Sequence, residues 1–160
     1  MRLDQFQEAL QSLSPIQFEQ FAADVIRKSG RFSEVRLESG PVDHGIDIAA
    51  VELDPLLVRP RRWVFQVKKT RVVGLDVARY MQAISLHAQR EGSTQVVLVA
   101  AGSISAAARE FFNRSDIQIW DAQKLAGLAT PEVLASWFGT TPTPVLSDTT
   151  TSDKAAAFSA

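Results

Sequence analysis

The stretch from residue 40 to residue 69 begins Gly-Pro-Val-Asp-His-Gly-Ile-Asp-Ile and ends Trp-Val-Phe-Gln-Val-Lys-Lys, and it decides the fold. Asp47 opens an apolar run, and a second apolar run carries Gln66 and Lys68. Because side chains alternate between the two faces of a strand, Gln66 and Lys68 point the same way. The 18 residues from 48 to 65 suffice for a strand, a turn and most of a second strand. The two runs are therefore expected to be antiparallel neighbours, with the three polar groups on one face.

These three side chains suggest a chemistry. An acid, an amide oxygen and an amine at a sheet edge can hold a divalent cation beside a phosphate. A metal-bound water becomes a workable nucleophile near neutral pH. The pattern therefore favours a nuclease core, in which Lys68 would orient that water or offset charge on the phosphate. Gln66 supplies no negative charge, and Glu19 could make up the missing charge.

Composition narrows the class of protein. A chain of 160 residues predicts one domain, and a hydrophobic content of 46% allows that domain to bury a real core. The absence of cysteine excludes disulfides and thiolate zinc sites. No stretch resembles a signal peptide or reaches membrane-spanning length, so we expect a cytoplasmic protein with no membrane partner. A net charge of −1 argues mildly against a protein that grips DNA tightly by itself.

Apolar periodicity and capping residues predict a single mixed α/β sheet flanked by helices, in the order α-α-β-β-β-α-β-α-β-α. The expected helices are 3–12, 15–29, 75–90, 105–113, 121–128 and 130–138, and the expected strands are 32–38, 47–53, 63–69, 95–101 and 117–120. After Phe138 the chain is rich in Thr, Ser and Pro with little apolar periodicity. We therefore expect a domain at 1–138 and a flexible linker or tail at 139–160.

Several segments together resemble a known family. They are Leu13-Ser14-Pro15 with Phe18-Glu19, Asp43-His44-Gly45-Ile46-Asp47, Phe65-Gln66-Val67-Lys68-Lys69, Val97-Leu98-Val99 before Gly102 to Ala108, and Ile117 to Leu125. This pattern is similar to the Mrr-type restriction endonuclease domain, a branch of the PD-(D/E)XK nuclease superfamily. Gly40-Pro41-Val42, Ala101-Gly102 and Ile104 depart from the usual residues of that family. The resemblance implies a restriction-endonuclease-like fold.

The resemblance also implies roles for individual residues. Asp47 is the principal metal ligand, Gln66 occupies the second acidic position, and the backbone carbonyl of Val67 is a further ligand. Lys68 is the catalytic lysine, and Glu19 is a candidate that completes the site from its helix. The implied cofactor is Mg²⁺, for which Mn²⁺ can substitute.

Residues around these positions are weaker candidates for contact with DNA. They are Asp43, His44, Arg62, Lys69 and Arg71. Asp43 has an alternative role as a turn-forming residue, and a loop histidine such as His44 is more often solvated than catalytic. A run of cations is usually a solvated face, although these cations flank the expected site and could hold phosphates.

The resulting hypothesis is a metal-dependent DNA endonuclease. The resemblance alone adds a role as the effector domain of a bacterial defence protein. The alternative is a catalytically silent nucleic-acid-binding or assembly module, which would not need Asp47, Gln66 and Lys68 together. The expected partners are DNA and a further domain or protein that supplies targeting or activation; a homo-oligomer would suit a double-strand cut.

Overall fold

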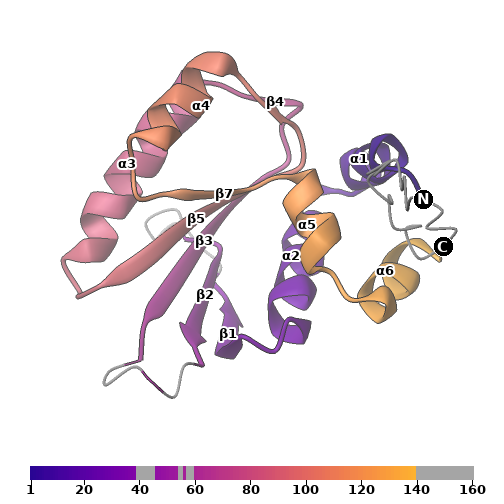
Figure 1. Ribbon diagram of the computed structural model, residues 1–160, viewed down its shortest axis with the longest axis horizontal. Helices are drawn as coiled ribbons and strands as arrows, with labels where there is room; N and C mark the ends of the chain where they lie inside the picture. Colours follow the sequence, from indigo (N-terminus) through magenta and orange to yellow (C-terminus); the bar gives the residue numbers. More distant parts are fainter. Residues whose placement is uncertain (39–45, 54–55, 57–59, 140–160) are drawn as a thin grey trace, which may run out of the picture.

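The computed structural model describes residues 1–38, 46–53, 56 and 60–139. A five-stranded mixed sheet separates two layers of helices (Figure 1). The helices are α1 (Leu3–Ser12), α2 (Pro15–Lys28), α3 (Leu75–Gln89), α4 (Ala106–Asn113), α5 (Ala122–Leu128) and α6 (Pro131–Phe138). The strands are β1 (Phe32–Leu37), β2 (Ile48–Glu52), β3 (Arg62–Lys68), β4 (Val72–Val73), β5 (Thr94–Ala100), β6 (Ser103–Ile104) and β7 (Gln118–Trp120).

The strand order places the beginning of β2 beside the end of β3. The order is β1-β2-β3-β5-β7, in which β1, β2 and β3 are antiparallel neighbours and β3, β5 and β7 run parallel. Ile48 at the start of β2 pairs with Phe65 near the end of β3. Asp47 and Lys68 therefore lie at the same edge of the sheet, although 21 positions separate them in the sequence.

The core has one apolar layer on each face of the sheet, because successive side chains of β3 and β5 alternate between the faces. Trp63 and Phe65 belong to the layer with α1, α2, α5 and α6, whereas Val64 and Leu98 belong to the layer with α3 and α4. All seven residues of β5 are buried, as expected for a central parallel strand covered on both sides. Gln66 and Lys68 alternate with Phe65 and therefore face the side of α3.

Local sequence signals explain where the helices begin. The side chain of Ser14 accepts a hydrogen bond from the backbone N–H of Gln17, and Pro15 is the first residue of α2. Ser105, Asp121 and Thr130 cap α4, α5 and α6 in the same way. The predicted helices and the five predicted main strands are confirmed, with ends that differ by one or two residues.

The predicted element order was incomplete. It lacked β4 and β6, two residues each, which pair in parallel beside the main sheet, and it wrote the two expected closing helices, 121–128 and 130–138, as a single element. The two short strands depend on a close approach of distant backbone segments. A Cβ atom on Gly102 would lie 2.1 Å from the carbonyl oxygen of Thr70 and 2.2 Å from that of Arg71. A local pattern of side chains carries no signal for such a contact.

Two further expectations concern membrane spans and the C-terminal tail. In the described part of the chain, no helix combines the length and apolar character needed to cross a membrane. The predicted tail lies outside the described residues, except for Gly139, which follows α6 with a φ of 70°.

Candidate active site

Asp47 is fixed by backbone contacts on both sides, directly before β2. Its backbone N–H donates to the carbonyl of Phe65 at 2.9 Å, and its carbonyl accepts from the N–H of Glu38 at 2.8 Å. Its carboxylate oxygen Oδ2 accepts a hydrogen bond of 2.7 Å from the backbone N–H of Val67. The carboxylate is thereby held against the last residues of β3, between Gln66 and Lys68.

The surroundings of Asp47 disfavour its charged form. Burial raises the pKa of this carboxyl above its ordinary value, and the Val67 N–H and the Lys68 ammonium offset only part of the effect. A carboxylate held in a costly ionised state at a sheet edge is a group that a nearby cation would stabilise. Perturbed carboxyl groups of this kind are concentrated at functional sites.

Gln66 is a polar residue inside an otherwise apolar strand. It is 7% exposed, and its oxygen Oε1 has no hydrogen-bond partner among the described residues. A buried acceptor without a partner costs about 1–3 kcal/mol. An oxygen with this unmet capacity can ligate a cation or accept a hydrogen bond from a bound molecule.

Lys68, the last residue of β3, lies beside an aromatic ring. Its ammonium nitrogen is 5.6 Å from the centre of the Tyr80 ring on α3, within the range of a cation–π contact. No ion pair joins Lys68 to a carboxylate in the described part of the chain. Tyr80 was not among the residues predicted for the site. Its one sequence signal was an aromatic side chain on the outward face of the expected helix.

Glu19 reaches the same region from α2. Burial raises the pKa of its carboxyl above the ordinary value, and the negative charge of Asp47 raises it further. The structure therefore brings Glu19 close enough to Asp47 for the two carboxylates to interact. One cation between them would relieve both effects.

The weaker candidates are dispersed. Arg62 forms an ion pair with Glu91 at the beginning of β3. Lys68 lies six residues further along the strand, which corresponds to roughly 20 Å. Lys69 follows Lys68 directly, and Arg71, two residues after Lys69, is exposed. Asp43 and His44 lie outside the described residues.

Three oxygen-bearing side chains near this edge could hold a divalent cation. Within the described ranges, no cluster of three or more His, Cys, Asp or Glu side chains is placed to hold a metal ion. These side chains are the carboxylates of Asp47 and Glu19 and the amide of Gln66, whose oxygen has no partner in the part of the chain that the structure describes. Magnesium binds through one or two carboxylates and keeps several water molecules, so this set matches its preferences.

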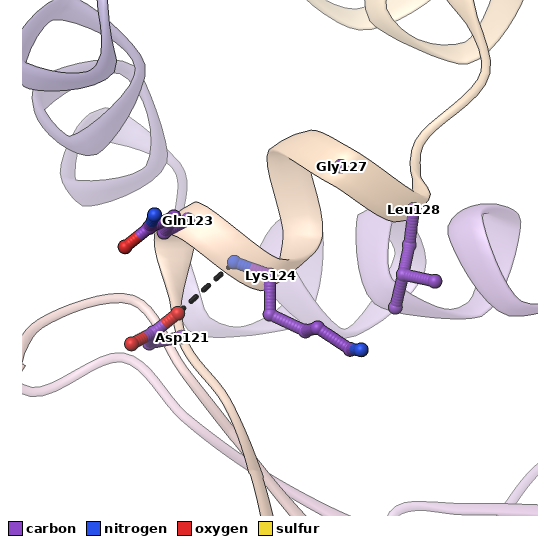
Figure 2. A pocket seen from close by; sticks show the side chains of 5 residues that line it. All are labelled: Asp121, Gln123, Lys124, Gly127 and Leu128. Atoms are coloured by element: carbon purple, nitrogen blue, oxygen red, sulfur yellow. Dashed lines mark hydrogen bonds between the residues drawn. The ribbon is translucent and has the colours of Figure 1, made fainter. Parts of the chain in front are cut away.

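A cavity along α5 is separate from this edge. It has a volume of about 400 Å³ and is lined by Asp121, Gln123, Lys124, Gly127 and Leu128 (Figure 2). Oδ1 of Asp121 accepts a hydrogen bond of 3.0 Å from the backbone N–H of Lys124, the dashed line in Figure 2. This carboxylate caps the first turn of α5, and none of the candidate site residues lines the cavity.

Three solved structures are similar to this chain. The chain is similar to the structure of AF1548, a protein of unknown function, with 20% identity, a TM-score of 0.52 and coverage of 68% of this chain and 65% of that one. A repair endonuclease from Pyrococcus abyssi is 20% identical, with a TM-score of 0.48 and coverage of 63% and 45%. The MspJI restriction endonuclease, solved with a 27-mer oligonucleotide, is 22% identical, with a TM-score of 0.47 and coverage of 86% and 32%. In each case the chain covers less than two thirds of the other protein.

The comparison with family models identifies the family of the chain, which the solved structures at 20–22% identity do not. No curated protein matches the chain. Residues 10–129 match the model of the Mrr catalytic domain, described as a restriction endonuclease, and this segment contains Glu19, Asp47, Gln66 and Lys68. The expected fold class and the expected family are both confirmed. The chain belongs to the Mrr-type restriction endonuclease family of nucleases.

Proposed function

We propose that this protein is a metal-dependent DNA endonuclease that hydrolyses phosphodiester bonds. The observation that carries the proposal is the meeting of three groups at the end of β3. These are the Asp47 carboxylate held on the Val67 amide, the unpartnered oxygen of Gln66 and the ammonium of Lys68. Together they offer oxygen ligands for a cation and a positive charge for a phosphate.

Each side chain has a separate task in this proposal. Asp47 and Gln66 hold the cation, with Glu19 and the backbone carbonyl of Val67 as further candidate ligands. A bound Mg²⁺, or Mn²⁺ in its place, supplies Lewis-acid charge and lowers the pKa of water. The ammonium of Lys68 stabilises the negative charge that grows on the phosphate during cleavage, and it can orient the attacking water.

Unfavourable electrostatics at the site support a catalytic protein over a module that only binds nucleic acid. Asp47 and Glu19 both carry raised pKa values, and Gln66 buries an acceptor that no described group satisfies. A domain that only binds DNA gains nothing from this combination. A cleavage site gains a place where a cation and a phosphate relieve the same unfavourable charges.

The substrate and partners are part of the same proposal. In this proposal Lys69 and Arg71, which lie shortly after Lys68 in the sequence, would contact phosphates near the cleaved bond. A net charge of −1 gives little general attraction to DNA, so a further domain or partner would supply targeting. The proposed setting is defence against foreign DNA in the cytoplasm, an inference from the family alone.

Incubation with supercoiled plasmid tests the proposal directly. We expect nicked and linear DNA with magnesium and no cleavage with EDTA. Asp47→Ala and Lys68→Ala should each lower the rate by about 10²-fold or more, the scale found when one charge-stabilising group is removed. Asp116→Ala and Lys124→Ala, which change exposed residues of the same types, are matched controls. A Lys68→Ala protein that cleaves at the wild-type rate would refute the assignment.

A further inference from the structure

Tyr80 is the exposed aromatic residue that meets Lys68. It lies on α3 between two buried residues, Ala78 and Met81, and is itself 46% exposed. The ammonium of Lys68 lies 5.6 Å from its ring centre. A ring that is 46% exposed contributes less to the core than its buried neighbours do. Core packing alone therefore does not explain why an aromatic side chain stands beside Lys68.

The fold brings the two residues together from distant parts of the sheet and helix layer. Ala78 and Met81 pack in the same apolar layer as Val64 of β3, which fixes α3 over this face of the sheet. Lys68 projects from the same face, two positions after Gln66. The position of the ring is therefore set by the core packing of α3.

The contact between Tyr80 and Lys68 matters because Lys68 forms no ion pair with Asp47 in the structure. Lys68 and Asp47 are near neighbours, and the ammonium lowers the pKa of the Asp47 carboxyl. Yet no ion pair joins Lys68 to Asp47, or to any other carboxylate that the structure describes. A direct ion pair would occupy the carboxylate oxygen that a cation needs. It would also use the N–H donors that a phosphate needs.

We infer that Tyr80 is a positioning residue that holds the Lys68 ammonium over its ring, off Asp47 and available to the phosphate. The inference rests on the proposed nuclease function and adds a residue to it. A cation–π contact attracts the ammonium through the face of the ring and engages no carboxylate, so N–H donors of the lysine remain for a phosphate. The ring alone supplies this attraction, and the phenol hydroxyl has no part in it.

Nuclear magnetic resonance of the free protein tests the contact without any cleavage. The chain has five lysines and one tyrosine, so carbon-13 labelling of lysine side chains gives few signals. The ε-methylene signal that disappears in Lys68→Met is expected upfield of the other four, because this carbon carries the ammonium that lies over the Tyr80 ring. Tyr80→Phe should keep this shift and Tyr80→Leu should abolish it. An unshifted Lys68 signal in the wild-type protein would overturn the inference.

Cleavage kinetics test the consequence. A contact of this kind contributes about a two- to fivefold effect, so Tyr80→Leu should lower kcat by that factor with little change in KM for DNA. Tyr80→Phe should retain the wild-type rate. Leu86→Ala, which trims another exposed side chain of α3 (65% exposed), is the matched control. Equal rates for Tyr80→Leu and Tyr80→Phe would overturn the inference, whether both are lowered or both are unchanged.

The two measurements separate this inference from the proposed function. A wild-type protein that shows the shifted Lys68 signal and cleaves no DNA would overturn the proposed function, and the contact between Tyr80 and Lys68 would then have no role in cleavage. A wild-type protein that cleaves DNA with an unshifted Lys68 signal would overturn the inference about Tyr80 and leave the proposed function standing.

Discussion

Replacing Asp47 with asparagine should make the protein more stable while it abolishes cleavage. The substitution keeps the size of the side chain and one acceptor oxygen, and it removes the charge. Because burial outweighs the groups that favour the charged form, the pKa of Asp47 is raised in the folded protein. At neutral pH the ionised carboxylate is therefore a net cost to folding, and asparagine removes that cost.

Two opposing contributions set the size of the effect. The hydrogen bond from Val67 to Oδ2 is 2.7 Å long, the length of a charge-assisted bond. Making its acceptor neutral costs about 1 kcal/mol, the difference between the ranges for charged and neutral hydrogen bonds. Relief of the buried charge exceeds this, because the pKa shift is upward overall. A net gain of about 1 kcal/mol is in the usual range for stabilising substitutions, and in a chain of this size it raises Tm by roughly 2–4 °C.

The dependence of this gain on pH follows from the direction of the shift. A carboxyl whose folded pKa lies above its ordinary value of 3.8 binds its proton more tightly in the folded state. The stability that this proton contributes is fully present below about pH 3.8 and is lost as pH rises through the raised pKa. Asp47→Asn and the wild type should therefore melt alike near pH 3.5, and their Tm values should diverge as pH rises from there towards pH 7. Glu19 acts in the same direction, because burial raises the pKa of its carboxyl and the charge of Asp47 raises that pKa further.

Thermal melts by circular dichroism, in buffers containing EDTA at several pH values, measure this difference. Asp116→Asn, an exposed residue of the same type, controls for the general effect of removing a negative charge. A lower Tm for Asp47→Asn at pH 7, with the spectrum unchanged, would refute the reasoning, because it would mean that the charge stabilises the fold. A gain that does not vary with pH would refute it as well.

Further substitutions test the metal ligands, the backbone and the core. Gln66→Glu should tighten magnesium binding in the free protein by adding a negative charge, and Glu19→Gln should weaken it; equal calorimetric affinities for these proteins and the wild type would remove both residues from the site. Gly102→Ala should lower Tm, because its Cβ would lie 2.1 and 2.2 Å from two backbone oxygens; an unchanged melt would show that this segment moves freely. Phe21→Ala, at a position 0% exposed, should cost about 3–5 kcal/mol in denaturant unfolding. Ile16→Ala, at a position 68% exposed on the same helix, should cost less than about 0.5 kcal/mol, and equal losses would contradict the assigned core.

The main elements could be predicted because their signals are local. Residues 75–90 show helical spacing of apolar side chains, and Ala78, Met81 and Ala88 on that stripe are buried in α3. Ser14 and Pro15 mark the start of α2 because a capping side chain and a preset φ act within one turn. The edge that joins Asp47 to the end of β3 followed from the short separation of two apolar strands.

The remaining features depend on contacts between distant segments. β4 and β6 exist because backbone groups near residue 72 meet those near residue 103, and two-residue strands leave no periodic pattern. Arg62 was grouped with the site because it is close to Lys68 in sequence. A strand extends by about 3.3 Å per residue, so Arg62 at the beginning of β3 and Lys68 at its end lie roughly 20 Å apart. Tyr80 is the opposite case, 12 positions after Lys68 in the sequence and beside it in the fold.

The place where the sequence departs from the rules of a stable core is also the place where chemistry is proposed. Trp63 to Val67 are all buried, and Gln66 is the polar residue among them. A valine at this position would satisfy the strand without leaving an unpaired acceptor. The raised pKa of Asp47 adds a second cost at the same edge. Because the proposed cation would relieve both costs, we explain them as parts of one site and not as two independent defects of packing.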